Sequence, residues 1–123
     1  MQAFKRAVEA RDLVALTALL APDVEFRSPV THKTYHGREV VGFILATVAQ
    51  VFGELTYVDE LESGGHSMLR FRVRIGDREG EGVDLIDCNE AGLVQRLTVM
   101  IRPLSALQAL AAAMGARLAP GAG

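Results

Sequence analysis

The chain has 123 residues, of which 50% are hydrophobic, and a formal net charge of -2. This length suits one domain rather than two, with enough apolar residues for a packed core. The 13 basic residues nearly balance the 15 acidic ones without forming a basic stripe, which argues against a nucleic-acid surface. The one cysteine, Cys88, cannot form an internal disulfide, so we expect a cytoplasmic protein rather than a secreted scaffold.

Neither a membrane span nor a signal peptide is expected. No apolar run approaches the roughly 18 residues that a span needs. The basic pair at residues 5–6 precedes an apolar stretch, but Glu9 and Arg11 interrupt that stretch. We therefore expect residues 1–119 to form a single domain and residues 120–123 to form a disordered tail.

Helical periodicity dominates the N-terminal part of the chain. Residues 2–20 are predicted to be helical, with Asp12 as an N-cap for the second stretch of helix. Residues 24–28 alternate between apolar and polar side chains, which is typical of a half-buried strand. A loop is predicted over residues 29–36, and the longest helix over residues 37–52.

After this helix the hydrophobic pattern changes from a helical period of about 3.6 to a strand period of about 2. Four strands are predicted, over residues 55–62, 67–75, 81–88 and 93–102. Short turns connect them, which indicates antiparallel pairing of consecutive strands. Pro103 ends the last strand, and residues 104–118 are predicted to form a terminal helix.

Helices followed by a run of antiparallel strands define the α+β class. We expect a cone-shaped, curved antiparallel sheet packed on the N-terminal helices and one long helix, with a C-terminal helix. A curved sheet with a helix in its concavity leaves space at one end, where ligand pockets form.

The apolar side chains of the predicted strands supply the lining of this pocket. By alternation, Leu97 and Val99 share the face that is expected to point inward. Met100 lies on the opposite face, where an apolar residue suits a partly covered outer surface. The candidate ligand-binding residues are Phe26, Ser28, Tyr35, Phe43, Phe71, Leu97 and Val99.

Asp84 is the strongest candidate for chemistry, because it lies in the middle of an apolar strand. If it shares the inner face with Gly82 and Ile86, burial raises the pKa of its carboxyl group. A protonated carboxyl there can donate a hydrogen bond to a ligand carbonyl, and an ionised one can act as a general base. The alternative interpretation is an exposed aspartate, or one paired with Arg72 or Arg96.

His32, Tyr35 and His36 cluster in the predicted loop after the first strand. They suit a polar pocket rim, and His32 is the candidate catalytic histidine because imidazole can shuttle protons near neutral pH. Ordinary loop polarity is the alternative, which we favour for His36. With His66 in a distant turn, the histidines lack metal-ligand spacing, so we expect no metal and no cofactor.

Two groups of segments carry a resemblance to a known superfamily. The first consists of RDL at residues 11–13, ALLAPDV at 18–24, SPV at 28–30 and HGRE at 36–39. The second consists of VDL at residues 83–85 and NEAGLV at 89–94. Through these segments nearly the whole chain resembles the nuclear transport factor 2-like superfamily, in its SnoaL-like and ketosteroid-isomerase-like branch. That fold hosts isomerases, hydrolases, cyclases, transport factors and domains without known activity.

The resemblance implies roles for particular positions. A ketosteroid isomerase would have a tyrosine where this chain has Phe4, and a catalytic aspartate where it has Ser28. Its second oxyanion donor, a protonated aspartic acid, aligns with Asp84. Two of three positions differ, which argues against steroid isomerisation by that mechanism. SnoaL-like cyclases use a pocket histidine and aspartate for proton transfer, which implies roles for His32 and Asp84. The limonene epoxide hydrolase branch needs a second carboxylate, which the sequence does not place near Asp84.

These observations predict a pocket for a small apolar organic molecule. The protein is then either a proton-transfer enzyme of isomerase, cyclase or hydrolase-like type that uses Asp84, or a non-catalytic ligand-binding or dimerisation module. We expect no nucleic-acid or membrane partner. A homodimer is expected, because the outer sheet face around Met100 is often a dimer contact in this superfamily.

Overall fold

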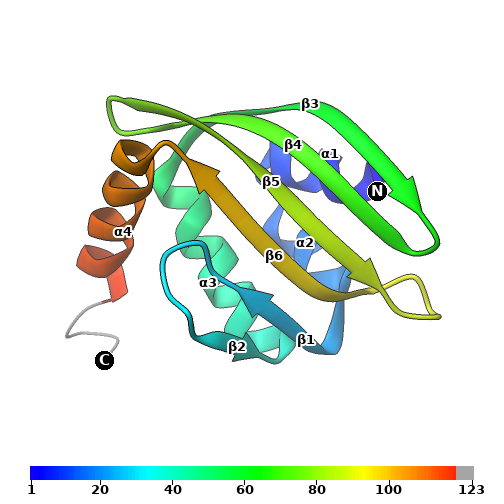
Figure 1. The fold of residues 1–123 in the computed structure, drawn as a ribbon. Coiled ribbons are helices and arrows are strands. Elements are labelled where there is room, and N and C mark those ends of the chain that lie inside the picture. The colour runs from blue at the N-terminus through cyan, green and yellow to red at the C-terminus, as the bar shows by residue number, and fades with distance from the viewer. Residues whose placement is uncertain (119–123) are drawn as a thin grey trace.

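The computed structural model describes residues 1–118 of the chain, so the predicted tail at residues 120–123 lies outside the described residues. The elements in chain order are α1 (Gln2–Ala10), α2 (Leu13–Ala18), β1 (Leu20–Arg27), β2 (Thr34–His36), α3 (Arg38–Val51), β3 (Phe52–Ser63), β4 (His66–Ile75), β5 (Arg78–Cys88), β6 (Val94–Arg102) and α4 (Leu104–Leu118). A curved sheet wraps over α1, α2 and α3, and α4 packs at one end of it (Figure 1). The predicted α+β class and its arrangement of helices around a curved sheet are confirmed.

The N-terminal helical region is divided in two at Arg11. This residue has φ 56, in the left-handed region that side chains other than glycine rarely adopt, and it ends α1. Asp12 then caps α2 as predicted, since its Oδ1 accepts a hydrogen bond of 3.1 Å from the N–H of Ala15. The predicted second stretch of helix and its cap are therefore confirmed, whereas the predicted end at residue 20 is wrong, because α2 ends at Ala18 and Leu20 already begins β1.

The sheet has six strands in the order β2-β1-β6-β5-β4-β3. The four C-terminal strands pair antiparallel with their neighbours in sequence, as the short turns predict. In contrast, β1 pairs parallel with β6, with Leu20 opposite Val94. Part of the predicted loop is also a strand, because Thr34–His36 pairs antiparallel with β1. These two pairings make the sheet wider than local sequence patterns predict.

The core lies between the helices and the concave face of the sheet, which is the face toward α1, α2 and α3. Strand β4 shows its register most clearly, since Leu69, Phe71, Val73 and Ile75 are all buried and the arginines between them are exposed. Burying one such side chain stabilises the fold by about 1.5–3 kcal/mol. A shift of the strand by one residue would exchange these two sets, so the alternation determines the register.

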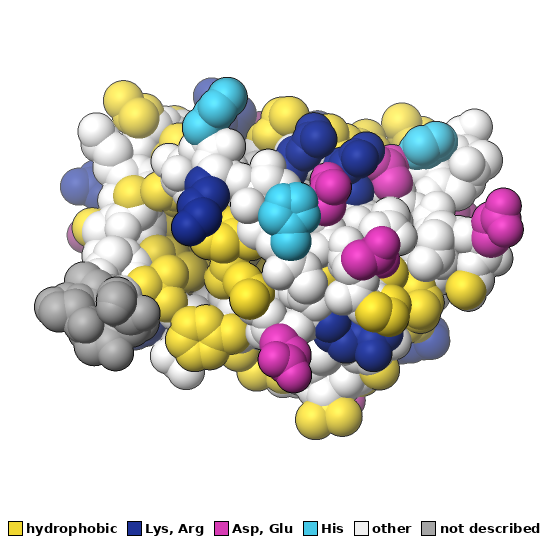
Figure 2. All heavy atoms as spheres, turned by 90° about the horizontal axis from the view of Figure 1, so that it is seen from below, with side chains coloured by type: hydrophobic (Ala, Val, Ile, Leu, Met, Phe, Trp, Pro, Cys, Tyr) yellow, Lys and Arg dark blue, Asp and Glu magenta, His cyan; other side chains and the backbone are white. Residues whose placement is uncertain are grey.

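Hydrophobic side chains also reach the outer surface. Met100 is 54% exposed, on the side of β6 away from the core, as the alternation predicts. Seen from below, the molecule has a hollow bordered by hydrophobic side chains, with charged and histidine side chains around it (Figure 2). Of the helices in residues 1–118, none combines the length and the apolar composition that crossing a membrane requires.

Candidate functional site

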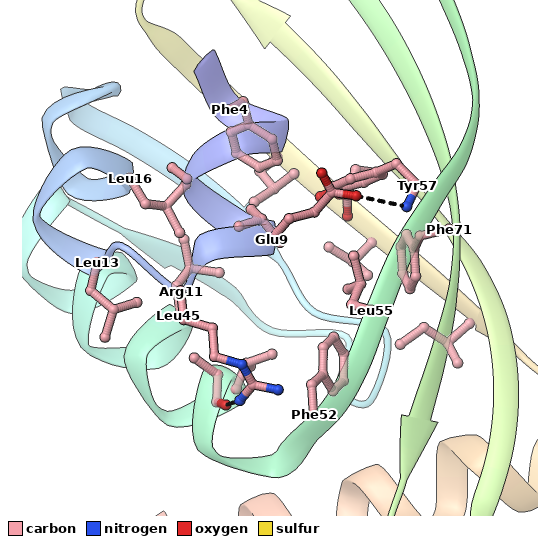
Figure 3. A pocket seen from close by; sticks show the side chains of 18 of the residues that line it. Phe4, Glu9, Arg11, Leu13, Leu16, Leu45, Phe52, Leu55, Tyr57 and Phe71 are labelled. Atoms are coloured by element: carbon pink, nitrogen blue, oxygen red, sulfur yellow. Dashed lines mark hydrogen bonds between the residues drawn. The ribbon is translucent and has the colours of Figure 1, made fainter. Parts of the chain in front are cut away.

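A cavity of about 430 Å³ lies between the concave face of the sheet and the helices. Such a volume is within the range of pockets that hold small molecules. Most of its walls are apolar, and they come from both halves of the chain (Figure 3). The apolar wall includes Phe4, Leu13, Leu16, Phe26, Leu45, Phe52, Leu55, Phe71, Leu97, Val99 and Leu110.

Asp84 contributes a buried carboxyl group to this apolar wall. Only 7% of the residue is exposed to solvent. Its register partners on the neighbouring strands are Leu69 and Val99, both apolar. Burial raises the pKa of Asp84 from 3.8 to about 7, although a hydrogen bond from Tyr57 lowers it in part. The carboxyl group is therefore partly protonated near neutral pH.

Tyr57 is the hydrogen-bond partner of this acid. Its O–H donates to Oδ2 of Asp84 over 2.9 Å, across the intervening strand β4. Its ring packs edge-on against Phe71, with ring centroids 6.1 Å apart. Burial and then the nearby charge of Asp84 raise the pKa of Tyr57 well above its usual value, so the phenol keeps its proton and acts as a donor.

The second oxygen of Asp84, Oδ1, has no hydrogen bond within residues 1–118. Every fully buried side-chain nitrogen or oxygen in this described part has a hydrogen-bond partner, so Oδ1, which has none, is not fully buried. Oδ1 is therefore accessible from the cavity, while Oδ2 is held by Tyr57. This arrangement leaves one polar atom on an otherwise apolar wall for interaction with a ligand.

Charged side chains gather at the mouth of the cavity, which we define by the exposed lining residues Glu9, Arg11 and Glu54. Oε2 of Glu9 accepts a hydrogen bond of 3.3 Å from the backbone N–H of Tyr57 (Figure 3). Arg11 donates from Nη1 to the carbonyl of Ala49 over 2.7 Å and from Nη2 to that of Gly53 over 2.6 Å. These two bonds join the corner between α1 and α2 to the end of α3 and the start of β3.

Five of the residues singled out from the sequence line this cavity. They are Phe26, Phe71, Asp84, Leu97 and Val99. All five lie on strands whose alternation is clear in the sequence, so the face of each strand could be predicted. The alternative pairing of Asp84 with an arginine does not occur, since Arg96 instead pairs with Glu25 and Asp87.

The other four predicted site residues, His32, Ser28, Tyr35 and Phe43, are not among the lining residues. His32 is exposed in the segment between β1 and β2. The hydroxyl of Ser28 is used locally, where it accepts a hydrogen bond of 3.1 Å from the N–H of Val30. Phe43 is 57% exposed on α3.

Tyr35 lies beside the wall on the neighbouring strand β2, where it is the register partner of Phe26 and the two ring centroids are 6.4 Å apart. Sequence reasoning missed Tyr57 and Glu9. Tyr57 had a signal, since it alternates with Leu55 on the inner face of β3. Glu9 had none, because it lies outside the apolar stripe of α1.

The fold is that of a known class. The chain shows the NTF2-like fold, which an NTF2-like protein of unknown function from Mesorhizobium loti shares at 17% identity, with a TM-score of 0.76 over 84% of this chain and 88% of the other. The SnoaL-like domain family matches residues 1–97, and the chain belongs to this family.

Two solved structures are more similar in sequence. A steroid delta-isomerase from Pseudomonas aeruginosa is 45% identical, with a TM-score of 0.88, over 93% of this chain and 85% of the other. An uncharacterised bacterial protein with a cystatin-like fold from Silicibacter pomeroyi is 38% identical, with a TM-score of 0.93, over 98% and 86%. No curated protein matches the sequence.

Proposed function

We propose that the cavity binds a small, mostly apolar molecule with a carbonyl group, and that the protein catalyses proton transfer next to that carbonyl. The observation that carries this proposal is the carboxyl group of Asp84, buried in an apolar wall with one oxygen held by Tyr57 and the other open to the cavity. Isomerisation and cyclisation both contain such a proton transfer.

In this reaction Asp84 acts in its protonated form. Oδ2 accepts the hydrogen bond from Tyr57, and the proton on Oδ1 is donated in a hydrogen bond to the ligand carbonyl. When a proton leaves the neighbouring carbon, negative charge develops on the carbonyl oxygen, and this hydrogen bond becomes stronger. A preorganised donor of this kind contributes about 100- to 1,000-fold to a rate.

Similarity to the steroid delta-isomerase from Pseudomonas aeruginosa supports the same class of chemistry. The residues differ from those that the ketosteroid-isomerase resemblance implies. Phe4 has no proton to donate, and the hydroxyl of Ser28 accepts a local hydrogen bond outside the cavity. Tyr57, from a different element, supplies the phenol that bonds to Asp84.

The exchange of α-hydrogens tests this proposal without knowledge of the natural substrate. With 1-indanone in D₂O, the protein is expected to catalyse deuterium incorporation, observed by proton NMR. Asp84→Asn should lower the catalysed rate at least about 100-fold, because an amide is a weaker acid than a carboxyl group. The rate of the parent protein should fall as pH rises above about 7, because the carboxyl group ionises.

Asp87→Asn is the matched control, because Asp87 lies on the same strand but pairs with His66 and Arg96 outside the cavity. An unchanged exchange rate in Asp84→Asn would contradict the proposal. Binding of 1-indanone, measured as a rise in melting temperature, without any exchange by the parent would instead favour the non-catalytic binding module.

A further inference from the structure

Tyr57 forms hydrogen bonds with two carboxyl groups, one through its side chain and one through its backbone. Its side-chain O–H donates to Asp84, and its backbone N–H donates to Glu9. The N–H is available because β3 is an edge strand of the sheet, and the register of β3 shifts just after Tyr57. Both acids line the same cavity, and Tyr57 forms a hydrogen bond with each of them.

The two acids differ in their environments. Asp84 is buried among apolar side chains, whereas Glu9 is exposed at the mouth. Within residues 1–118, Glu9 forms no salt bridge with a lysine or an arginine. Lys5 pairs with Glu60, and Arg11 donates to backbone carbonyls. Paired acids in unlike environments are suited to separate roles, with the buried one kept as an acid and the exposed one as a base.

The reaction proposed above needs a proton acceptor other than Asp84. Besides Asp84 and Tyr57, the ionisable residues that line the cavity in the described part of the chain are Glu9, Arg11 and Glu54. Arginine does not act as a base because it stays protonated. Of the two glutamates, only Glu9 is held by a hydrogen bond to Tyr57, which fixes it relative to Asp84.

We propose that Glu9 is the general base of this site, a role that rests on the proposed proton-transfer function. The carboxylate of Glu9 removes a hydrogen from the carbon beside the carbonyl as a proton. The electron pair of the broken C–H bond forms an enolate, whose oxygen is stabilised by the hydrogen bond from Asp84. Because Glu9 is exposed, the abstracted proton on its carboxyl group exchanges with water, and Glu9 then returns a proton, or in D₂O a deuteron, to the enolate carbon.

The variant Glu9→Gln isolates the base, because the amide oxygen of glutamine can still accept the N–H of Tyr57. Exchange of 1-indanone hydrogens in D₂O is expected to fall at least about 100-fold, with the dissociation constant of 1-indanone unchanged within about twofold. Glu54→Gln is the comparison variant, since it removes the other glutamate of the mouth, and its loss of rate should be much smaller than that of Glu9→Gln. Glu9→Asp, which keeps the carboxylate on a shorter side chain, should recover part of the lost rate.

The possible failures are distinguishable. Exchange at the parent rate in Glu9→Gln, together with a large loss in Asp84→Asn, would overturn the role of Glu9 and leave the proposed function standing. No exchange by the parent protein would overturn both. Equal losses in Glu9→Gln and Glu54→Gln would also contradict the assignment, because they would point to the charge of the mouth rather than to one positioned base.

Discussion

At pH 9 the variant Asp84→Asn is expected to be more stable than the parent protein, by up to about 4 kcal/mol in the free energy of unfolding. The cause is the buried carboxyl group, whose pKa rises from 3.8 to about 7 on folding, mainly through burial. At pH 9 this group must be ionised inside an apolar wall. Asparagine stays neutral, and its amide oxygen can still accept the hydrogen bond from Tyr57.

The pH dependence follows from the raised pKa. The proton held by Asp84 stabilises the folded protein fully below about pH 3.8, and this contribution is lost as pH rises through about 7. Urea unfolding at pH 5 and pH 9 measures the effect, and the advantage of Asp84→Asn should be much larger at pH 9. The outer-face variant Asp87→Asn should show no such gain. An advantage of equal size at both pH values would contradict the buried position of the acid.

A large loss of stability is expected for Gly82→Ala, of about 3 kcal/mol or more. Gly82 is the register partner of Phe71 on β4 and of Ile101 on β6. A Cβ atom there would lie closer to the carbonyl oxygen of Met100 than van der Waals contact allows, and 2.8 Å from Cζ of Phe71. Because the first of these atoms belongs to the backbone, the strands themselves must separate.

The same change would disturb the site, because the Phe71 ring supports Tyr57. Gly115→Ala in α4 is the matched control, since nothing lies within 4 Å of its added Cβ. That helical substitution should stabilise the protein by roughly 0.5–1 kcal/mol. Urea unfolding and melting temperatures measure both variants, and a Gly82→Ala protein as stable as its parent would refute the close packing of β5 against β4 and β6.

The part of the fold that follows from local periodicity could be predicted from the sequence. Strands β4, β5 and β6 alternate cleanly and are joined by short turns, and α4 begins after Pro103 as expected. The parallel pairing of β1 with β6 could not be predicted, because it joins Leu20 to Val94 through tertiary contacts with no local signal. Strand β2 has only three residues, too few for a period to appear.

The candidate site likewise has parts that follow from local sequence patterns and parts that depend on tertiary contacts. The inward position of Asp84 follows from its place in an alternating strand. Its bond to Tyr57 depends on the register of β3 on β4 and of β4 on β5, which includes irregular steps in β3. Glu9 reaches the wall only because α1 packs along the edge of β3. Ser28 is not among the lining residues, and its hydroxyl instead accepts a local hydrogen bond from the N–H of Val30 just after β1 ends.

The central claim is that Asp84 is a buried acid beside Tyr57 in an apolar cavity, and a carbon-13 NMR titration of its carboxyl group tests this most directly. We expect an inflection near pH 7, and a still higher pKa in Tyr57→Phe, because the lost hydrogen bond is the influence that lowers it. A carboxyl group that titrates near its ordinary value of 3.8 in both proteins would place the acid in water and contradict the account.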